Sequence, residues 1–278
     1  MASRIARRVT RSRSLGRPTS VVFITAGDPD LPTTERIVLA LDSAGVDILE
    51  LGIPFSDPMA DGPTIQASSQ RALRHCVNIP QVLELAARVR EKCDIPIVLM
   101  SYYNPVLQTG LDAFAQACSW AGVDGVILTD LTPEEAGPWK RAAAAAGVDT
   151  IFLVAPTSTD ERIALVSRIA SGFIYCVSRT GVTGARDQFP ADELSSLVSR
   201  IRAKTNLPVM IGFGISKPEH VRLAAQVADG VVVGSALVDV IAHNQNAPNL
   251  PEIVSAKAAE LFGLSSGVQL PPRSGPDE

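Results

Sequence analysis

The chain has 278 residues, of which 46% are hydrophobic, and its formal net charge is −4. This length and composition allow a substantial buried core, and the slightly acidic balance gives no reason to expect a nucleic-acid partner. No apolar run approaches the about 20 residues that cross a membrane. The four cysteines form no CxxC pair and the three histidines form no HExxH pattern. We therefore expect reduced thiols in a cytoplasmic protein, with no metal site and no membrane span.

The first 19 residues are basic. Arginines precede the first acidic residue, Asp28, at positions Arg4, Arg7, Arg8, Arg11, Arg13 and Arg17. This Arg- and Ser-rich composition resembles an organellar transit peptide, and Arg7-Arg8 faintly resembles a twin-arginine signal. No secretory apolar segment follows, because VVFITAG is short and runs straight into the fold. We therefore expect residues 1–19 to form a solvated amphipathic lead-in helix, and we favour this interpretation over a targeting signal.

Short runs rich in Val, Ile and Phe alternate with longer helical patterns. The predicted strands are residues 20–25, 47–52, 95–101, 125–130, 150–155, 173–178, 208–213 and 230–234. Strands that are apolar almost throughout are buried on both faces, which is typical of a parallel sheet. Eight of them alternating with helices predict a single α/β domain, a (β/α)8 TIM barrel with an extra N-terminal helix. An open doubly wound sheet is the main alternative.

Helical patterns lie between the predicted strands, at residues 81–92, 113–122, 133–147 and 190–204. Several end at glycine directly before a strand, as in SAGVD, WAGVD and AAGVD, and glycine adopts the left-handed conformation of a helix end at little cost. No linker divides the chain. We expect one barrel domain over residues 20–263, followed by a Pro- and Gly-rich tail at 264–278 that frays.

Two carboxylates stand out in the run ELGIPFSDPMADGPTIQ. Glu50 ends the apolar strand VDILEL, and Asp61 follows eleven positions later in a loop rich in Pro, Gly and Asp. Active sites of barrels lie at the carboxyl ends of the strands. An acid on a rigid strand facing an acid on a mobile loop suits proton transfer in a closing pocket. The plainer alternative is that Glu50 ends a strand and Asp61 shapes a turn.

Small residues gather after the last three predicted strands. They are Gly181, Gly184, Gly212, Gly214, Gly234 and Ser235. In barrels, the loops after strands seven and eight commonly bind phosphate with the help of a short helix, which SALVDVI supplies here. Each glycine alone also fits a turn, but their agreement predicts a phosphate site. The polar segment at residues 178–188 fits either a closing lid or an ordinary long loop.

Seven segments, in order, resemble the tryptophan synthase alpha subunit. They are FITAGDPD, ELGIPFSDPMADGPTIQ, YYNPVL, LVAPTSTDERI, YCVSRTGVTG, GFGISKPEHV and VVVGSALV. The resemblance runs from about Phe23 to Val240. It implies a barrel lyase of tryptophan biosynthesis that cleaves indole-3-glycerol phosphate to indole and glyceraldehyde 3-phosphate. It also implies an αββα complex in which a pyridoxal-phosphate beta subunit receives indole through a tunnel, with no cofactor in this chain.

The resemblance makes Glu50 the catalytic glutamate and Asp61 the catalytic aspartate, and it gives Tyr175 a supporting role. The chemistry is consistent with this assignment. Indole C3 must be protonated and the C3′ hydroxyl then deprotonated, and one carboxyl group can perform both steps. Positive charge builds on the indole nitrogen as C3 is protonated, and a fixed carboxylate stabilises it.

The resemblance also assigns binding residues. It implies phosphate contacts from Gly184, Gly214, Gly234 and Ser235. It implies walls for the indole ring, each of which fits ordinary core packing equally well, at Phe23, Leu99, Tyr102, Ile127, Phe213 and Val232. Thr183 is expected to contact Asp61 when the lid closes. The residues expected to face the beta subunit are Asp57, Pro58 and Asn104.

Thr129 and Thr132 depart from the family, which usually reads PDLP where this chain has TDLT. Proline fixes φ and lacks a backbone donor, so threonine alters the stiffness of this loop and the surface beside it. This leaves open a stand-alone lyase that releases free indole. A non-catalytic regulatory partner of a beta-type subunit is an alternative of another class, which the presence of Glu50 and Asp61 argues against. A barrel acting on a different sugar phosphate would require the indole walls to be misassigned.

Overall fold

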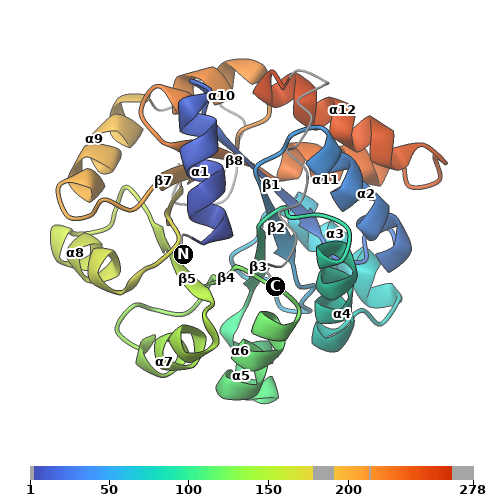
Figure 1. The fold of residues 1–278 in the computed structure, drawn as a ribbon, viewed down its shortest axis with the longest axis horizontal. Coiled ribbons are helices and arrows are strands. Elements are labelled where there is room, and N and C mark those ends of the chain that lie inside the picture. Colours follow the sequence, from blue (N-terminus) through green and yellow to red (C-terminus); the bar gives the residue numbers. More distant parts are fainter. Residues whose placement is uncertain (1–2, 178–190, 213, 265–278) are drawn as a thin grey trace, which may run out of the picture.

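The computed structural model describes residues 3–177, 191–212 and 214–264. It shows a closed barrel of parallel strands surrounded by helices (Figure 1). The strands are β1 (Thr19–Thr25), β2 (Ile48–Gly52), β3 (Ile97–Ser101), β4 (Gly125–Leu128), β5 (Asp149–Val154), β6 (Ile174–Val177), β7 (Val209–Gly212) and β8 (Gly230–Val233). Each strand pairs with its neighbours in sequence, and β1 also pairs with β8. The (β/α)8 barrel is confirmed, and its closure excludes the open sheet.

The described residues form twelve helices. They are α1 (Arg4–Ser14), α2 (Leu31–Ser43), α3 (Pro63–Arg74), α4 (Ile79–Arg90), α5 (Tyr103–Thr109), α6 (Leu111–Trp120), α7 (Gly137–Ala146), α8 (Asp160–Ile169), α9 (Ala191–Arg202), α10 (Pro218–Ala225), α11 (Ser235–His243) and α12 (Leu250–Phe262). Capping residues fix where several of these helices begin and end. Asn78 and Gln81 form a capping box at the start of α4, and Gly147, with φ of 71°, ends α7. None of these helices is long and apolar enough to cross a bilayer.

Alternate side chains of each strand enter two separate hydrophobic clusters. Leu49 and Leu51 of β2 pack outward among the residues beneath the helices, whereas Ile48 points into the barrel. The inner cluster also includes Val21, Val98, Ile127, Ile151, Phe173, Tyr175, Met210 and Val232. Because strand side chains alternate with a period of two, Glu50 points into the barrel with Ile48. The fold therefore buries the carboxyl group of Glu50 in a barrel interior that is lined mainly by apolar side chains.

Helix α1 packs against the amino-terminal end of the barrel (Figure 1). Ile5 and Val9 belong to the inner cluster. Arginines of α1 and the residues after it pair with aspartates that directly precede strands. These pairs are Arg4 with Asp124, Arg13 with Asp229 and Arg17 with Asp47. The expected amphipathic helix is present, but its apolar side is not solvated, because it covers the barrel interior. Most of the predicted tail, residues 265–278, lies outside the described residues.

Candidate active site

Glu50 is fully buried in β2, and neither of its carboxyl oxygens has a hydrogen-bond partner among the described residues. Burial without a partner disfavours the charged form and raises the pKa of Glu50 to about 8. The carboxyl group is therefore mostly protonated at neutral pH. A buried polar group that lacks partners is costly, and such groups concentrate where chemistry requires them.

Asp61 lies on the loop between β2 and α3 and is partly buried. Burial raises its pKa to about 6, although an interaction with the Tyr102 side chain acts in the opposite direction. Asp61 is therefore mostly ionised at neutral pH, whereas Glu50 is mostly protonated. Two carboxyl groups held in different protonation states are typical of a site that performs acid–base chemistry.

A cavity lies at the carboxyl ends of β1 to β4. The residues that line it are Phe23, Thr25, Gly52, Ile53, Asp61, Ile65, Ser69, Met100, Ser101, Tyr102 and Thr129. Gly52 makes room for the Phe23 ring, since a Cβ at this position would lie 2.6 Å from that ring. Apolar walls with a few polar groups suit a flat aromatic ligand that carries polar substituents.

Tyr175 of β6 belongs to the same inner cluster and is buried. Burial and, secondarily, the negative charge of Glu50 raise the pKa of Tyr175 well above its usual value. The phenol therefore stays protonated. Its hydroxyl occupies the space that a side chain at Gly212 would fill, since a Cβ there would lie 2.1 Å from the Tyr175 oxygen.

The carboxyl ends of β7 and β8 carry the described part of the predicted phosphate site. Gly234 directly precedes α11, and Ser235 is the first residue of that helix. Gly214 has φ of 76°, a conformation that favours glycine, and no atom lies within 4 Å of a Cβ built there. A helix N-terminus next to open, small residues is suited to bind an anion.

Comparison with known proteins identifies the family. The model of the family described as tryptophan synthase alpha chain matches residues 10–262. The chain belongs to this family. A tryptophan synthase alpha chain from Geobacter sp. (strain M21) is 51% identical over 265 residues, which cover 95% of this chain and 99% of the relative. The relative from Geotalea daltonii is 56% identical over 218 residues, covering 78% of this chain and 82% of its own length.

Solved structures of tryptophan synthase show the same fold. The alpha subunit from Legionella pneumophila str. Paris has a TM-score of 0.86 at 35% identity, and the match covers 95% of this chain and 98% of that one. A chain from the α2β2 complex of Pyrococcus furiosus has a TM-score of 0.82 at 39% identity, with coverage of 89% and 99%. Structures of alpha chains within tryptophan synthase complexes are thus among the neighbours.

One indole wall inferred from the resemblance to tryptophan synthase is wrong. Leu99 belongs to the outer cluster, between the strands and the helices, because Val98 is the residue that points inward. The alternation places Met100 on the cavity side, and Met100 does line the cavity. The sequence does not indicate Met100 as a wall, because nearly every residue of IPIVLMS is apolar and the alternation of the two faces is hidden.

The other predicted walls that the structure describes point inward. Phe23 and Tyr102 line the cavity, and Ile127 and Val232 lie in the inner cluster. Further predicted residues lie outside the described part of the chain, namely Thr183, Gly184, Phe213 and the whole segment 178–188.

The residues expected to face a tryptophan synthase beta subunit lie at the surface. Asp57 and Asn104 are exposed, and Pro58 is partly exposed. Two large apolar side chains that the sequence analysis did not single out are exposed beside them in the chain: Met59 at 93% and Leu107 of α5 at 48%. Both side chains are therefore accessible to a partner protein.

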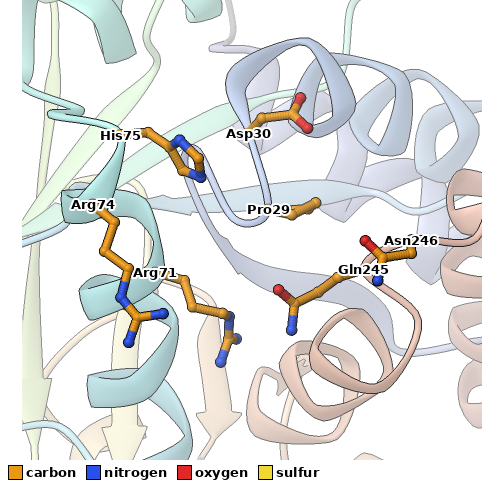
Figure 2. Close-up of a pocket in the computed structure, with 7 residues that line it drawn as sticks. All are labelled: Pro29, Asp30, Arg71, Arg74, His75, Gln245 and Asn246. Carbon is orange, nitrogen blue, oxygen red and sulfur yellow. The ribbon is translucent and has the colours of Figure 1, made fainter.

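A second cavity, outside the proposed catalytic centre, contains none of the predicted site residues (Figure 2). It is lined by Pro29, Asp30, Arg71, Arg74, His75, Gln245 and Asn246. Arg71 is held in place in the cavity wall, because its Nε and Nη2 atoms donate to the two carboxylate oxygens of Asp28, both at 2.7 Å. The Asp28 side chain is completely buried, so Arg71 is its neutralising partner.

Replacing Arg71 with alanine is expected to lower the free energy of unfolding by about 3 to 5 kcal/mol, because it leaves the buried Asp28 carboxylate without its counter-charge. Urea unfolding of the purified variant measures this loss. Arg74→Ala is the matched control on the same helix. Arg74 is exposed and forms no ion pair with a described residue, so a change of no more than about 0.5 kcal/mol is expected. Equal losses in the two variants would show that the pair does not stabilise the fold.

Proposed function

We propose that Glu50 and Asp61 perform the chemistry of this chain. As a tryptophan synthase alpha chain, it is a lyase of tryptophan biosynthesis that cleaves indole-3-glycerol phosphate to indole and glyceraldehyde 3-phosphate. The observation that supports the assignment most strongly is the state of Glu50. It is a buried carboxyl group with no hydrogen-bond partner among the described residues and a pKa of about 8. It is thus ready to donate a proton at neutral pH.

The reaction needs one proton delivered and one removed. Protonated Glu50 donates its proton to C3 of the indole ring, which places a positive charge on the ring nitrogen. The Glu50 carboxylate then accepts the proton of the C3′ hydroxyl. A carbonyl forms at C3′, the C3–C3′ bond breaks, and its electron pair returns to the ring and neutralises the nitrogen. Glu50 ends protonated as it began, so a single carboxyl group serves both steps.

Asp61 stabilises the charge that appears between these two steps. Its pKa of about 6 keeps it ionised at neutral pH. A negative charge fixed in a partly dehydrated cavity stabilises a developing cation more in the transition state than in the ground state, which raises the rate. We give the neutral phenol of Tyr175 a supporting role beside Glu50.

We propose that the substrate spans the carboxyl end of the barrel. The indole ring lies against Phe23, Met100, Tyr102, Ile127 and Val232. The phosphate group binds at the N-terminus of α11, with contacts from Gly184, Gly214, Gly234 and Ser235. Support comes from the inward or cavity-lining positions of the described walls and from the small residues after β7 and β8.

The two pKa values predict a bell-shaped pH dependence of kcat/KM for indole release. Below about pH 6, Asp61 is protonated and loses the charge that stabilises the cation. Above about pH 8, Glu50 is ionised and cannot deliver the first proton. Activity should therefore be highest between these values, which steady-state assays from pH 5 to 9.5 can test. A rate that rises steadily through this range would contradict the assignment.

We propose that the exposed surface of Asp57, Pro58, Met59, Asn104 and Leu107 binds a tryptophan synthase beta subunit in an αββα complex. Relatives of the chain occur in such complexes, which supports a beta partner. The pyridoxal phosphate would belong to that partner, with none bound in this chain, and we expect both subunits in the cytoplasm. The stand-alone lyase remains the second candidate, because Thr129 and Thr132 stand where the family usually has proline.

Indole release by the purified chain, measured with and without a beta subunit, separates these candidates. A weak rate that rises strongly when the beta subunit is added supports the coupled alpha subunit. A high rate that does not respond to the beta subunit establishes the stand-alone lyase. Activation of the beta subunit by a chain that releases no indole would instead identify a regulatory partner.

A further inference from the structure

Tyr102 contacts both ends of the segment that leads to Asp61. It lies at the junction of β3 and α5, and its side chain is largely buried. Its ring lies against that of Phe55, with 5.1 Å between the ring centroids. Its hydroxyl oxygen accepts a hydrogen bond from the backbone N–H of Ala60 at 3.0 Å. One side chain from a neighbouring strand end thus holds residues 55 to 60 of the loop.

The same hydroxyl also interacts with the Asp61 carboxyl group. The Tyr102 hydroxyl oxygen accepts the hydrogen bond from the Ala60 N–H, so the hydroxyl proton remains free to point at Asp61. An ionised Asp61 carboxylate can only accept, so in this interaction Tyr102 is the donor. This interaction lowers the pKa of Asp61 and contributes to the raised pKa of Tyr102, whose main cause is burial. Asp61 and Tyr102 are the titratable groups among the described residues that line the cavity.

Thr129 supports Tyr102 from the next strand. Its backbone N–H and its hydroxyl both point to the carbonyl oxygen of Ser101, at 3.0 and 3.3 Å. Its side chain also interacts with the Tyr102 hydroxyl. Proline, which the family usually has at this position, would supply neither donor. Thr129 therefore makes two hydrogen bonds to the carbonyl group of Ser101, directly before Tyr102, that proline could not make.

We propose that Tyr102 is a positioning residue for Asp61, in addition to forming a wall of the pocket. By holding the N–H of Ala60, the residue before Asp61, with its hydroxyl group and packing its ring against Phe55, it fixes the loop and so the orientation of the Asp61 carboxylate before the substrate binds. A carboxylate that is already oriented need not be immobilised in each turnover, which lowers the barrier of the chemical step. The inference rests on the proposed role of Asp61 in cleavage.

Tyr102→Phe tests the inference, because phenylalanine keeps the ring and removes only the hydroxyl. We expect kcat for indole release to fall about tenfold, the effect of one hydrogen bond to a charged group, and KM to change less than about twofold. The acidic side of the pH profile should move to higher pH, because the interaction with Tyr102 that lowers the pKa of Asp61 is lost. Tyr103→Phe is the matched control, and its rate should equal that of the wild type.

A double substitution distinguishes positioning from a general structural effect. In an Asp61→Asn background, Tyr102→Phe should change kcat by less than about twofold, because the group that it positions is already absent. Equal losses in both backgrounds, or a change in KM alone, would overturn the inference and leave Tyr102 only a pocket wall. Wild-type protein that releases no indole would overturn the proposed function itself. A Tyr102→Phe variant as fast as an active wild type would overturn only the positioning role.

Discussion

Replacing Glu50 with glutamine is expected to lower the turnover of indole-3-glycerol phosphate by about 10² to 10⁴. Glutamine matches the size of the protonated side chain but can neither donate nor accept the proton that the two steps require. KM should change little, because the proton moves only in the chemical step. Steady-state indole release by the wild type and Glu50→Gln measures the effect. An unchanged rate would remove Glu50 from the mechanism.

The pH dependence of stability of the same variant should show that the buried Glu50 carboxyl group is held protonated in the folded protein. Its pKa is about 8 in the fold against an ordinary value of 4.5, so folding disfavours its ionisation. The contribution of Glu50 to stability is therefore most favourable below about pH 4.5 and becomes less favourable as the pH rises through 8, with a cost of about 3 kcal/mol at pH 7. Glu50→Gln has no such titration. Its stability relative to the wild type should rise between pH 5 and 8, and a constant difference would show that Glu50 is not held protonated.

Replacing Asp61 with asparagine is expected to lower kcat by about 10² to 10³, the usual effect of removing one group that stabilises charge in a transition state. Asparagine keeps the shape and removes the negative charge that faces the developing cation. The acidic side of the pH profile should disappear in this variant, because the group that titrates near pH 6 is absent. Assays of kcat across the pH range test both expectations.

Asp112→Asn is a suitable control for this substitution, because Asp112 is exposed on α6 and contributes to none of the proposed sites. Its activity should match that of the wild type. If Asp61→Asn raised KM and left kcat unchanged, Asp61 would contribute to substrate binding and not to stabilisation of the cation.

The barrel was predictable because its strands are apolar almost throughout and helical patterns separate them. Burial on both faces follows from such runs, and eight repeats lead to closure. The carboxylates were also predictable, since the predicted strand 47–52 carries Glu50 in its carboxyl-terminal half and Asp61 lies in the loop that follows. Both therefore had to lie at the same end of the barrel, as the structure shows.

Other features depend on contacts that a single sequence does not contain. Leu99 was misplaced because a strand that is apolar on both faces does not indicate which alternate residues point inward. The burial of Ile5 and Val9 was missed because an amphipathic helix has the same pattern whether it is solvated or docked. Likewise, nothing in the local sequence predicts that the Tyr102 hydroxyl lies against Ala60, 42 positions away.

A product balance tests directly whether Glu50 cleaves indole-3-glycerol phosphate. The purified chain is incubated with indole-3-glycerol phosphate, and both products are quantified for the wild type and Glu50→Gln, with and without a beta subunit. We expect indole and glyceraldehyde 3-phosphate in equal amounts from the wild type, and a rate lower by at least about 10² for the variant in both conditions. A folded wild-type chain that forms neither product in either condition would contradict this expectation, as would equal rates for the wild type and the variant.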